Sequence, residues 1–215
     1  VQAYMVNGAR TSKKSGNKAA MFQPGAILDL EVYHNEQKPV QRIKECSWAF
    51  LYHHIMSDVI KNSIALYMVE LLQKSLKQPE KNTNLFYFCE EALMQLDAAE
   101  KQVSANFALY FTLHLADFFG FRISNNMLEC EGVYLDLREG EFVMEHPAHP
   151  YFISGQLALI TAELLKTMLP AELDQVKLNK QTRRELLLKY QEYYALHIHD
   201  FGQMKTLTVL HEVLA

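Results

Sequence analysis

The period of the hydrophobic residues changes once along the chain, near residue 45, and this change constrains the fold more than any other feature. Before that point, apolar and polar residues alternate with a period of two, which is typical of half-buried strands. After it, apolar residues recur every three or four positions, which is typical of amphipathic helices. The sequence therefore predicts an α+β multidomain protein, with a β-rich domain over residues 1–45 and a mainly α-helical domain over residues 46–215.

Three strands are expected in the N-terminal domain, over residues 1–6, 26–33 and 40–45. The second strand alternates clearly, and its two faces are Leu28, Leu30 and Val32 against Asp29, Glu31 and Tyr33. Strands joined by basic loops are consistent with part of a small barrel. The helical domain is expected to contain helices over residues 48–72, 84–99, 104–119, 156–169, 182–197 and 203–214. Ser104 and Ser154 are the predicted N-caps of two of them, and a small β-hairpin is expected near 132–145, turning at residues 138–140.

Charge divides unevenly between the two domains. Residues 1–44 hold seven bases and three acids, a net of +4, whereas residues 45–215 hold fourteen bases and twenty-two acids, a net of −8. The loop over residues 7–18 contains four bases and no acid, together with hydroxyl side chains and glycines that suit contact with phosphate. The four bases are Arg10, Lys13, Lys14 and Lys18. The alternative is a solvated surface loop, because basic flexible loops are common.

Several classes of function are disfavoured by what the sequence lacks. Cys46, Cys89 and Cys130 form no CxxC pair, which argues against a zinc ribbon or thioredoxin-like site and favours a reducing, cytoplasmic location. No apolar run is long enough for a membrane span. No GxSxG, P-loop or GxGxxG motif occurs. We expect no catalytic residue, no cofactor and no enzyme activity, although a hydrolase stays open as an alternative because the residues of a catalytic triad need not be close in sequence.

Nine histidines raise the alternative of a metal-dependent hydrolase. The close pairs are His53 with His54, His146 with His149, and His197 with His199. None of these pairs has the i, i+4 spacing on one helical face, or a local third ligand, that a helical zinc motif requires. A structural or surface role is therefore the prediction for these histidines, with no bound metal.

Aromatic residues at helical spacing between residues 107 and 121 predict a buried core. The alternative is a hydrophobic groove for a partner peptide, because two short helices would carry more aromatic surface than one core is expected to absorb. The candidate groove residues are Phe107, Tyr110, Phe111 and Leu115.

Several short motifs in this sequence are informative when taken in their order and spacing. Residues 6–10 read Val-Asn-Gly-Ala-Arg and residues 20–24 read Ala-Met-Phe-Gln-Pro. They resemble the (K/N)GAR and (L/F)QP motifs of the RecO family of bacterial recombination mediators. Residues 111–121 resemble its aromatic helix with a Gly-aromatic step, and residues 193–210 resemble its closing segment. The hairpin at residues 134–142 resembles Bacteroidetes-type members in particular. The resemblance spans essentially the whole chain.

The resemblance implies an N-terminal OB-fold, whose first strands in the family precede Val1, so the barrel is expected to be partial here. Many members carry a four-cysteine zinc site after the aromatic helix. Residues 122–131 contain only Cys130, and we therefore expect a zinc-free member.

The function that the resemblance implies is non-enzymatic DNA repair. Such a protein binds single- and double-stranded DNA, anneals complementary strands and, with RecR, helps to load RecA onto DNA coated by single-strand-binding protein (SSB). It is expected as a monomer, associated with the nucleoid, with the acidic SSB C-terminal tail bound at Phe107, Tyr110, Phe111 and Leu115. The expected DNA contacts are Arg10, Lys13, Lys14 and Lys18, with Lys38, Arg42 and Lys44 as further candidates. A helical interaction scaffold without DNA binding is the alternative.

Overall fold

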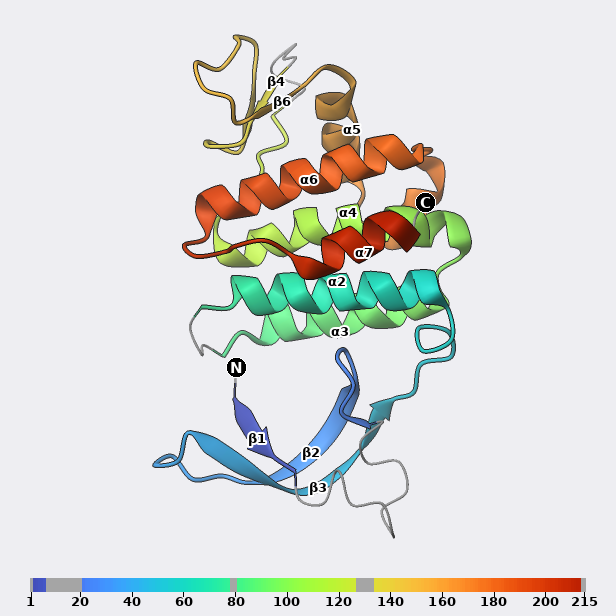
Figure 1. The fold of residues 1–215 in the computed structure, drawn as a ribbon, viewed down its shortest axis with the longest axis vertical. Coiled ribbons are helices and arrows are strands. Elements are labelled where there is room, and N and C mark those ends of the chain that lie inside the picture. Colours follow the sequence, from blue (N-terminus) through green and yellow to red (C-terminus); the bar gives the residue numbers. More distant parts are fainter. Residues whose placement is uncertain (1, 7–20, 78–80, 127–133, 214–215) are drawn as a thin grey trace.

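The computed structural model describes residues 2–6, 21–77, 81–126 and 134–213. A three-stranded sheet lies at one end of the molecule, a stack of helices forms the middle, and a second small sheet lies at the other end (Figure 1). We refer to residues 2–6 and 21–50 as the β part and to the described residues from 51 to 213 as the helical part. The predicted change from β to α structure is therefore confirmed.

The first sheet has the strand order β1-β3-β2. Strand β1 (Ala3–Met5) pairs in parallel with β3 (Val40–Phe50), and β2 (Ile27–Tyr33) pairs with β3 in antiparallel. Two irregularities in the β2–β3 register bend the long strands. The described strands form open sheets and no closed barrel, so an OB-fold stays a prediction from the resemblance.

Strand β3 continues to Phe50, beyond the end predicted at residue 45, and the helix predicted from residue 48 is wrong over its first part. Trp48 pairs with Leu28 in the sheet. Trp48 and Tyr52 are four positions apart, which fits a period of two as well as one helical step, so the pattern alone does not separate the two structures. Helix α2 (Val59–Ser75) begins only after Asp58, whose carboxylate accepts hydrogen bonds from the backbone N–H groups of Ile60 and Lys61.

The segment that joins the two parts is fixed by a buried carboxylate. Asp97 on α3 accepts backbone hydrogen bonds from His53, His54 and Ile55, at 2.8, 2.8 and 2.7 Å. Lys61 donates to the backbone carbonyl of Asp97 at 2.6 Å. These contacts hold the linker between sheet and helices against the side of the helical part.

The predicted helices are present, with shifted ends. The remaining helices are α3 (Thr83–Ala98), α4 (Lys101–Ala116), η1 (Asp117–Phe119), α5 (Gly155–Lys166), η2 (Pro170–Gln175), α6 (Lys180–His197) and α7 (Lys205–Val213). Ser104 is not an N-cap: it lies inside α4, and its hydroxyl donates to the carbonyl of Glu100. Ser154 does occupy the N-cap position of α5, but its side chain makes no capping hydrogen bond.

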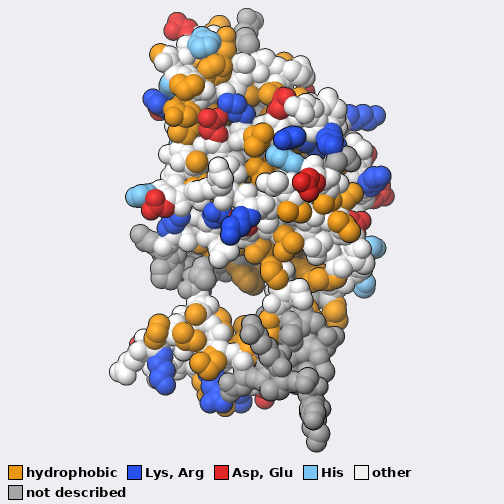
Figure 2. Space-filling model, viewed as in Figure 1, with side chains coloured by type: hydrophobic (Ala, Val, Ile, Leu, Met, Phe, Trp, Pro, Cys, Tyr) orange, Lys and Arg blue, Asp and Glu red, His pale blue; other side chains and the backbone are white. Residues whose placement is uncertain are grey.

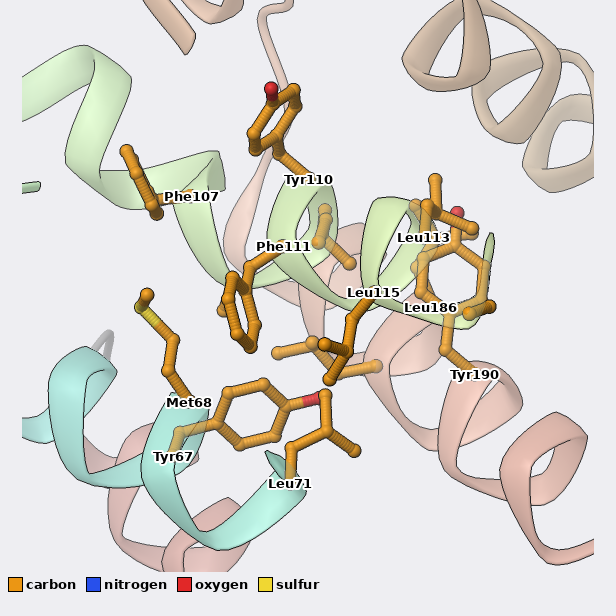
Figure 3. Close-up of a cluster of buried hydrophobic side chains, with 14 of the residues drawn as sticks. Tyr67, Met68, Leu71, Phe107, Tyr110, Phe111, Leu113, Leu115, Leu186 and Tyr190 are labelled. Carbon is orange, nitrogen blue, oxygen red and sulfur yellow. The ribbon is translucent and has the colours of Figure 1, made fainter. Parts of the chain in front are cut away.

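Helix α4 runs through the centre of the helical part and packs against helices on several sides (Figure 1). Phe111 and Leu115 point toward Tyr67, Met68 and Leu71 of α2 (Figure 3). The buried tyrosines keep their hydroxyl groups paired, since Tyr67 bonds Thr112 at 2.8 Å and Tyr190 bonds Thr161 at 2.9 Å. The core is therefore dense and aromatic, and it belongs almost wholly to the helical part.

The predicted hairpin is confirmed as β4 (Tyr134–Asp136) and β5 (Glu141–Val143). A third strand that we did not predict, β6 (Phe152–Ser154), pairs with β4 on its other side. At the turn, the Asp136 carboxylate accepts hydrogen bonds from the backbone of Arg138 and Glu139 and contacts the imidazole of His149 at 3.2 Å. In the described part of the chain, no helix is long and apolar enough to cross a membrane.

Candidate nucleic-acid interface

The predicted DNA contacts fall into two groups. Arg10, Lys13, Lys14 and Lys18 lie outside the described residues. Lys38, Arg42 and Lys44 are described and exposed: Lys38 lies in the turn before β3, and the other two lie on β3 itself. Lys and Arg side chains are visible along the lower side of the sheet (Figure 2).

One row of side chains crosses the sheet at this place. Met5 of β1 and Tyr33 of β2 are both register partners of Arg42 on β3. Partners in a sheet project from the same face, so Arg42 lies between an exposed aromatic ring and an exposed thioether. Tyr33 is 57% exposed and Met5 is 56% exposed. We call these three residues the Tyr33 row.

A hollow of 450 Å³ adjoins the Tyr33 row. Tyr33, Arg42 and Lys44 line it, together with Val6. Val6 immediately precedes the basic loop at residues 7–18, so the chain enters that loop from the rim of the hollow. An aromatic ring, two bases and the start of a basic loop are thus gathered at one end of the sheet.

The electrostatics of the described sheet are mixed. Lys44 forms an ion pair with Glu31 at 2.5 Å across the strands. Asp29, Glu36 and Glu45 are also exposed on or near the sheet. The excess of positive charge in the N-terminal part therefore comes from the four bases of the loop and not from the sheet alone.

Tyr33 and Tyr4 are the residues that sequence reasoning missed, because no base-stacking residue was predicted. Tyr4 is 42% exposed on β1. The signal was present for Tyr33, since the alternation placed it on the polar face of its strand with Asp29 and Glu31. A tyrosine on the polar face of a strand is an exposed aromatic ring, which is the element that base stacking requires.

The predicted partner groove on α4 needs correction. Phe107, Phe111 and Leu115 are at most 1% exposed, so they are core residues and do not form an accessible surface. The reason is that α4 is surrounded by other helices, which absorb the aromatic side chains. Tyr110 is also buried, at 6% exposed, but it points away from Tyr67 and Leu71 of α2 (Figure 3) and lines a small hollow beside α3.

A different hollow, of 620 Å³, lies between α6 and α7. Lys180 and Arg184 line it with Leu188 and Leu207, and Glu212 is the one acidic residue among its described lining residues. His211 also lines it; burial and, to a lesser degree, Arg184 lower the pKa of its imidazole. We call this the basic hollow, because the positively charged Lys180 and Arg184 stand beside leucine side chains there.

The histidine pairs do not assemble a metal site in the described part of the chain, where no group of three or more His, Cys, Asp or Glu residues is placed to hold an ion. His54 hydrogen-bonds the backbone of Asp97, and His197 bonds the carbonyl of Leu137. Cys130 lies outside the described residues, and the prediction of a zinc-free protein is not decided by these contacts. Burial raises the pKa of the Cys89 thiol to about 12, which leaves it unreactive at neutral pH.

The structure joins a sheet with exposed bases to a packed helical part. Comparison with known proteins shows which family has this helical part. The family model described as "Recombination protein O C terminal" matches residues 56–206, which places the helical part among recombination proteins. The DNA repair protein RecO of Flavobacterium psychrophilum is 34% identical over 100% of this chain and 87% of its own length. That of Azobacteroides pseudotrichonymphae is 31% identical over 94% of this chain and 82% of its own length.

The chain therefore belongs to the RecO family of DNA repair proteins, as its motifs predict. The DNA repair protein RecO of Bacteroides fragilis is also similar, with 30% identity over 94% of this chain. Membership of the family assigns the chain a role in DNA repair and recombination, in association with DNA.

Proposed function

We propose that this chain is a recombination mediator that binds single- and double-stranded DNA through its β part. The observation that carries the proposal is the Tyr33 row and its hollow, which adjoin the start of the basic loop. In this proposal, Arg10, Lys13, Lys14 and Lys18 contact phosphates, with Arg42, Lys44 and Lys38 beside them. The sheet is proposed to belong to an OB-fold.

The chemistry of the row suits single-stranded DNA. Bases neutralise the phosphate backbone, while an exposed aromatic ring offers a flat surface on which a nucleobase stacks regardless of its identity. Tyr33 beside Arg42 supplies both kinds of contact within one row of the sheet. Binding without sequence preference is what annealing of arbitrary complementary strands requires.

The wider activity follows from family membership as a proposal. The chain anneals complementary strands and, with RecR, helps to load RecA onto SSB-coated single strands. It performs no covalent step, so it requires no catalytic residue and no cofactor. A helical scaffold that does not bind DNA is the competing function, and the experiment below separates the two.

For the acidic SSB tail, we propose the basic hollow in place of α4. A tail that combines carboxylates with apolar side chains is matched by Lys180 and Arg184 beside Leu188 and Leu207. Calorimetry with a tail peptide tests this, using Lys180→Ala with Arg184→Ala. Binding that survives this double substitution unchanged contradicts the assignment.

The DNA proposal is tested by fluorescence anisotropy of a labelled single strand. Tyr33→Ala is expected to weaken binding roughly tenfold, since one stacked base contributes about 1–3 kcal/mol. Tyr33→Phe keeps the ring and is expected to bind like the wild type. Tyr87→Ala is the matched control, because Tyr87 is similarly exposed, at 59%, but lies on α3. If Tyr33→Ala and Tyr87→Ala bind the strand with equal affinity, stacking at the Tyr33 row is contradicted.

A further inference from the structure

Two adjoining hollows, of 530 and 230 Å³, form one groove between α3, α4 and the segment over residues 168–174. They share Gln95, Leu169 and Pro170 as lining residues. We call this the acidic groove. It is separate from the Tyr33 row and from the basic hollow, and neither DNA binding nor the assignment of the SSB tail makes use of it.

The helices that line the acidic groove present small apolar residues there, which leave an apolar hollow between them. Ala92 and Ala98 of α3 leave room above Val103 of α4. On the opposite side, Met168 and Leu169 are 72% and 60% exposed. Two large apolar side chains exposed beside an apolar hollow are typical of a protein-binding surface.

The groove is held open by hydrogen bonds within the chain. The Glu172 carboxylate accepts from the backbone N–H groups of Met168 and Leu169, at 2.8 and 3.1 Å. The hydroxyl of Tyr110 donates to the carbonyl of Met168 at 3.1 Å. The segment that carries the exposed side chains is therefore fixed before any partner arrives, which lowers the entropy cost of binding.

The charged residues among the described lining of the groove have one sign. Glu91, Glu100 and Asp174 line it, and none of its described lining residues is Lys or Arg. Burial raises the pKa of Tyr110, and the negative charges of Glu91 and Glu172 raise it further, which reflects the same accumulation of acids. A carboxylate-rich ligand meets like charge here, whereas Lys and Arg side chains meet opposite charge.

We propose that the acidic groove docks a segment of a partner protein in which apolar side chains are flanked by Lys or Arg. The apolar side chains enter between Ala98 and Leu169, and the flanking bases meet Glu91, Glu100 and Asp174. The helical part thus carries two peptide-binding surfaces of opposite charge, and this one selects basic segments. The inference does not depend on DNA binding by the β part.

The test measures binding of two short labelled peptides to the full chain by fluorescence anisotropy. Both contain the same pair of leucines, flanked by lysines in one peptide and by glutamates in the other. The groove variant is Glu100→Lys with Asp174→Lys. The matched control is Glu139→Lys with Glu145→Lys, which makes the same change in net charge at exposed residues near the small sheet. Thermal unfolding checks that both variants fold.

We expect the lysine peptide to bind the wild type and the control equally, and the groove variant roughly tenfold more weakly. The glutamate peptide matches the basic hollow, so we expect its binding to be no weaker in the groove variant than in the wild type. Equal loss of the lysine peptide in the groove variant and the control overturns the proposal, as does an equal loss of both peptides in the groove variant or absence of binding by the lysine peptide.

Ala98→Trp keeps the test decisive if the charge variant fails to fold. Ala98 is exposed on α3 and lines the groove, so a larger ring there fills the space that the leucines require. We expect this variant to lose binding of the lysine peptide. Retained binding contradicts the location. Self-association of the chain that disappears in Ala98→Trp also overturns the proposal, because it identifies a second copy as the occupant.

Discussion

The two parts of this molecule are stabilised differently. Of the buried hydrophobic residues in the described chain, Ile27 alone comes from the β part, and all others lie between residues 55 and 210. The β part instead exposes Tyr4, Met5, Leu30 and Tyr33 on its strands. The comparison teaches that the helical part is built around a core, whereas the β part leaves large side chains exposed to solvent.

The largest expected effect separates the cores of the two parts. Leu115→Ala removes a fully buried side chain from α4 and is expected to lower the free energy of unfolding by about 2–5 kcal/mol. Leu30→Ala, at a residue that is 39% exposed in the sheet, is expected to cost about 1 kcal/mol or less. Urea denaturation measures both. Equal losses would contradict the view that the β part lacks a comparable core.

The connection between the parts is expected to give the second largest effect. Asp97→Ala leaves the backbone N–H groups of His53, His54 and Ile55 without their acceptor and is expected to cost roughly 3 kcal/mol. Asp97→Asn keeps the shape and is expected to cost less. Urea denaturation of the two variants at neutral pH tests this, and wild-type stability in the alanine variant would show that the linker is held by other contacts.

This connection should also depend on pH. Burial alone would raise the pKa of Asp97, but the three backbone hydrogen bonds outweigh it and hold that pKa below its usual range. The stabilisation is therefore complete above the ordinary Asp pKa of about 4, and it is lost as the pH falls through the lowered value. In acid titrations followed by urea denaturation, the difference between wild type and Asp97→Asn should shrink. A constant difference contradicts this assignment.

A smaller effect is expected where α7 docks on α2. The Glu70 carboxylate accepts hydrogen bonds from the backbone N–H groups of Lys205 and Thr206 at the start of α7, at 2.9 and 2.8 Å. Glu70→Ala is expected to cost about 1–2 kcal/mol and to speed amide hydrogen exchange in α7 before that in α6. Equal acceleration in both helices would mean that α7 does not open by itself.

The smallest expected effect on stability lies in the sheet. The ion pair of Glu31 with Lys44 is exposed, so Glu31→Gln should change the free energy of unfolding by less than about 1 kcal/mol, and less still at high salt. The same substitution removes a negative charge beside Lys44 and is expected to strengthen binding of single-stranded DNA roughly two- to threefold. Anisotropy titration measures this, and weaker binding would indicate that the pair positions Lys44 for DNA.

Much of the fold could be predicted because periodicity reports burial on one face. The strand at residues 26–33 and the helix at residues 182–197 were found close to their observed bounds. The boundary between β3 and α2 was missed because Trp48 and Tyr52, four positions apart, satisfy both periods. Two contacts decide between strand and helix here. The register of β3 with β2 is a tertiary contact, and the N-cap at Asp58 is a local one.

The charged residues of the candidate site could be predicted from the sequence, whereas the exposure of its side chains could not. Bases in a loop are visible in the sequence, whereas the exposure of Tyr33 depends on which strands flank it. For the same reason, the aromatic residues of α4 suggested an open groove, although Phe107 and Phe111 are buried by neighbouring helices. The acidic groove and the basic hollow are lined by residues that are distant in sequence, so no local pattern indicates them.

The central claim is that DNA is bound by the basic loop at residues 7–18 and by the sheet of the β part. The most direct test titrates a labelled single strand with the chain at several salt concentrations. It compares wild type with a variant in which Arg10, Lys13, Lys14 and Lys18 are changed to alanine. The control changes four exposed bases of the helical part to alanine, namely Lys81, Lys101, Lys166 and Lys177.

Each phosphate contact on a single strand contributes about −0.7 to the slope of log K against log salt. The account predicts that the loop variant flattens this slope by roughly 2–3 units and that the control leaves it nearly unchanged. Equal slopes for the two variants, or binding that does not respond to salt, would contradict DNA binding by the β part and favour the helical scaffold.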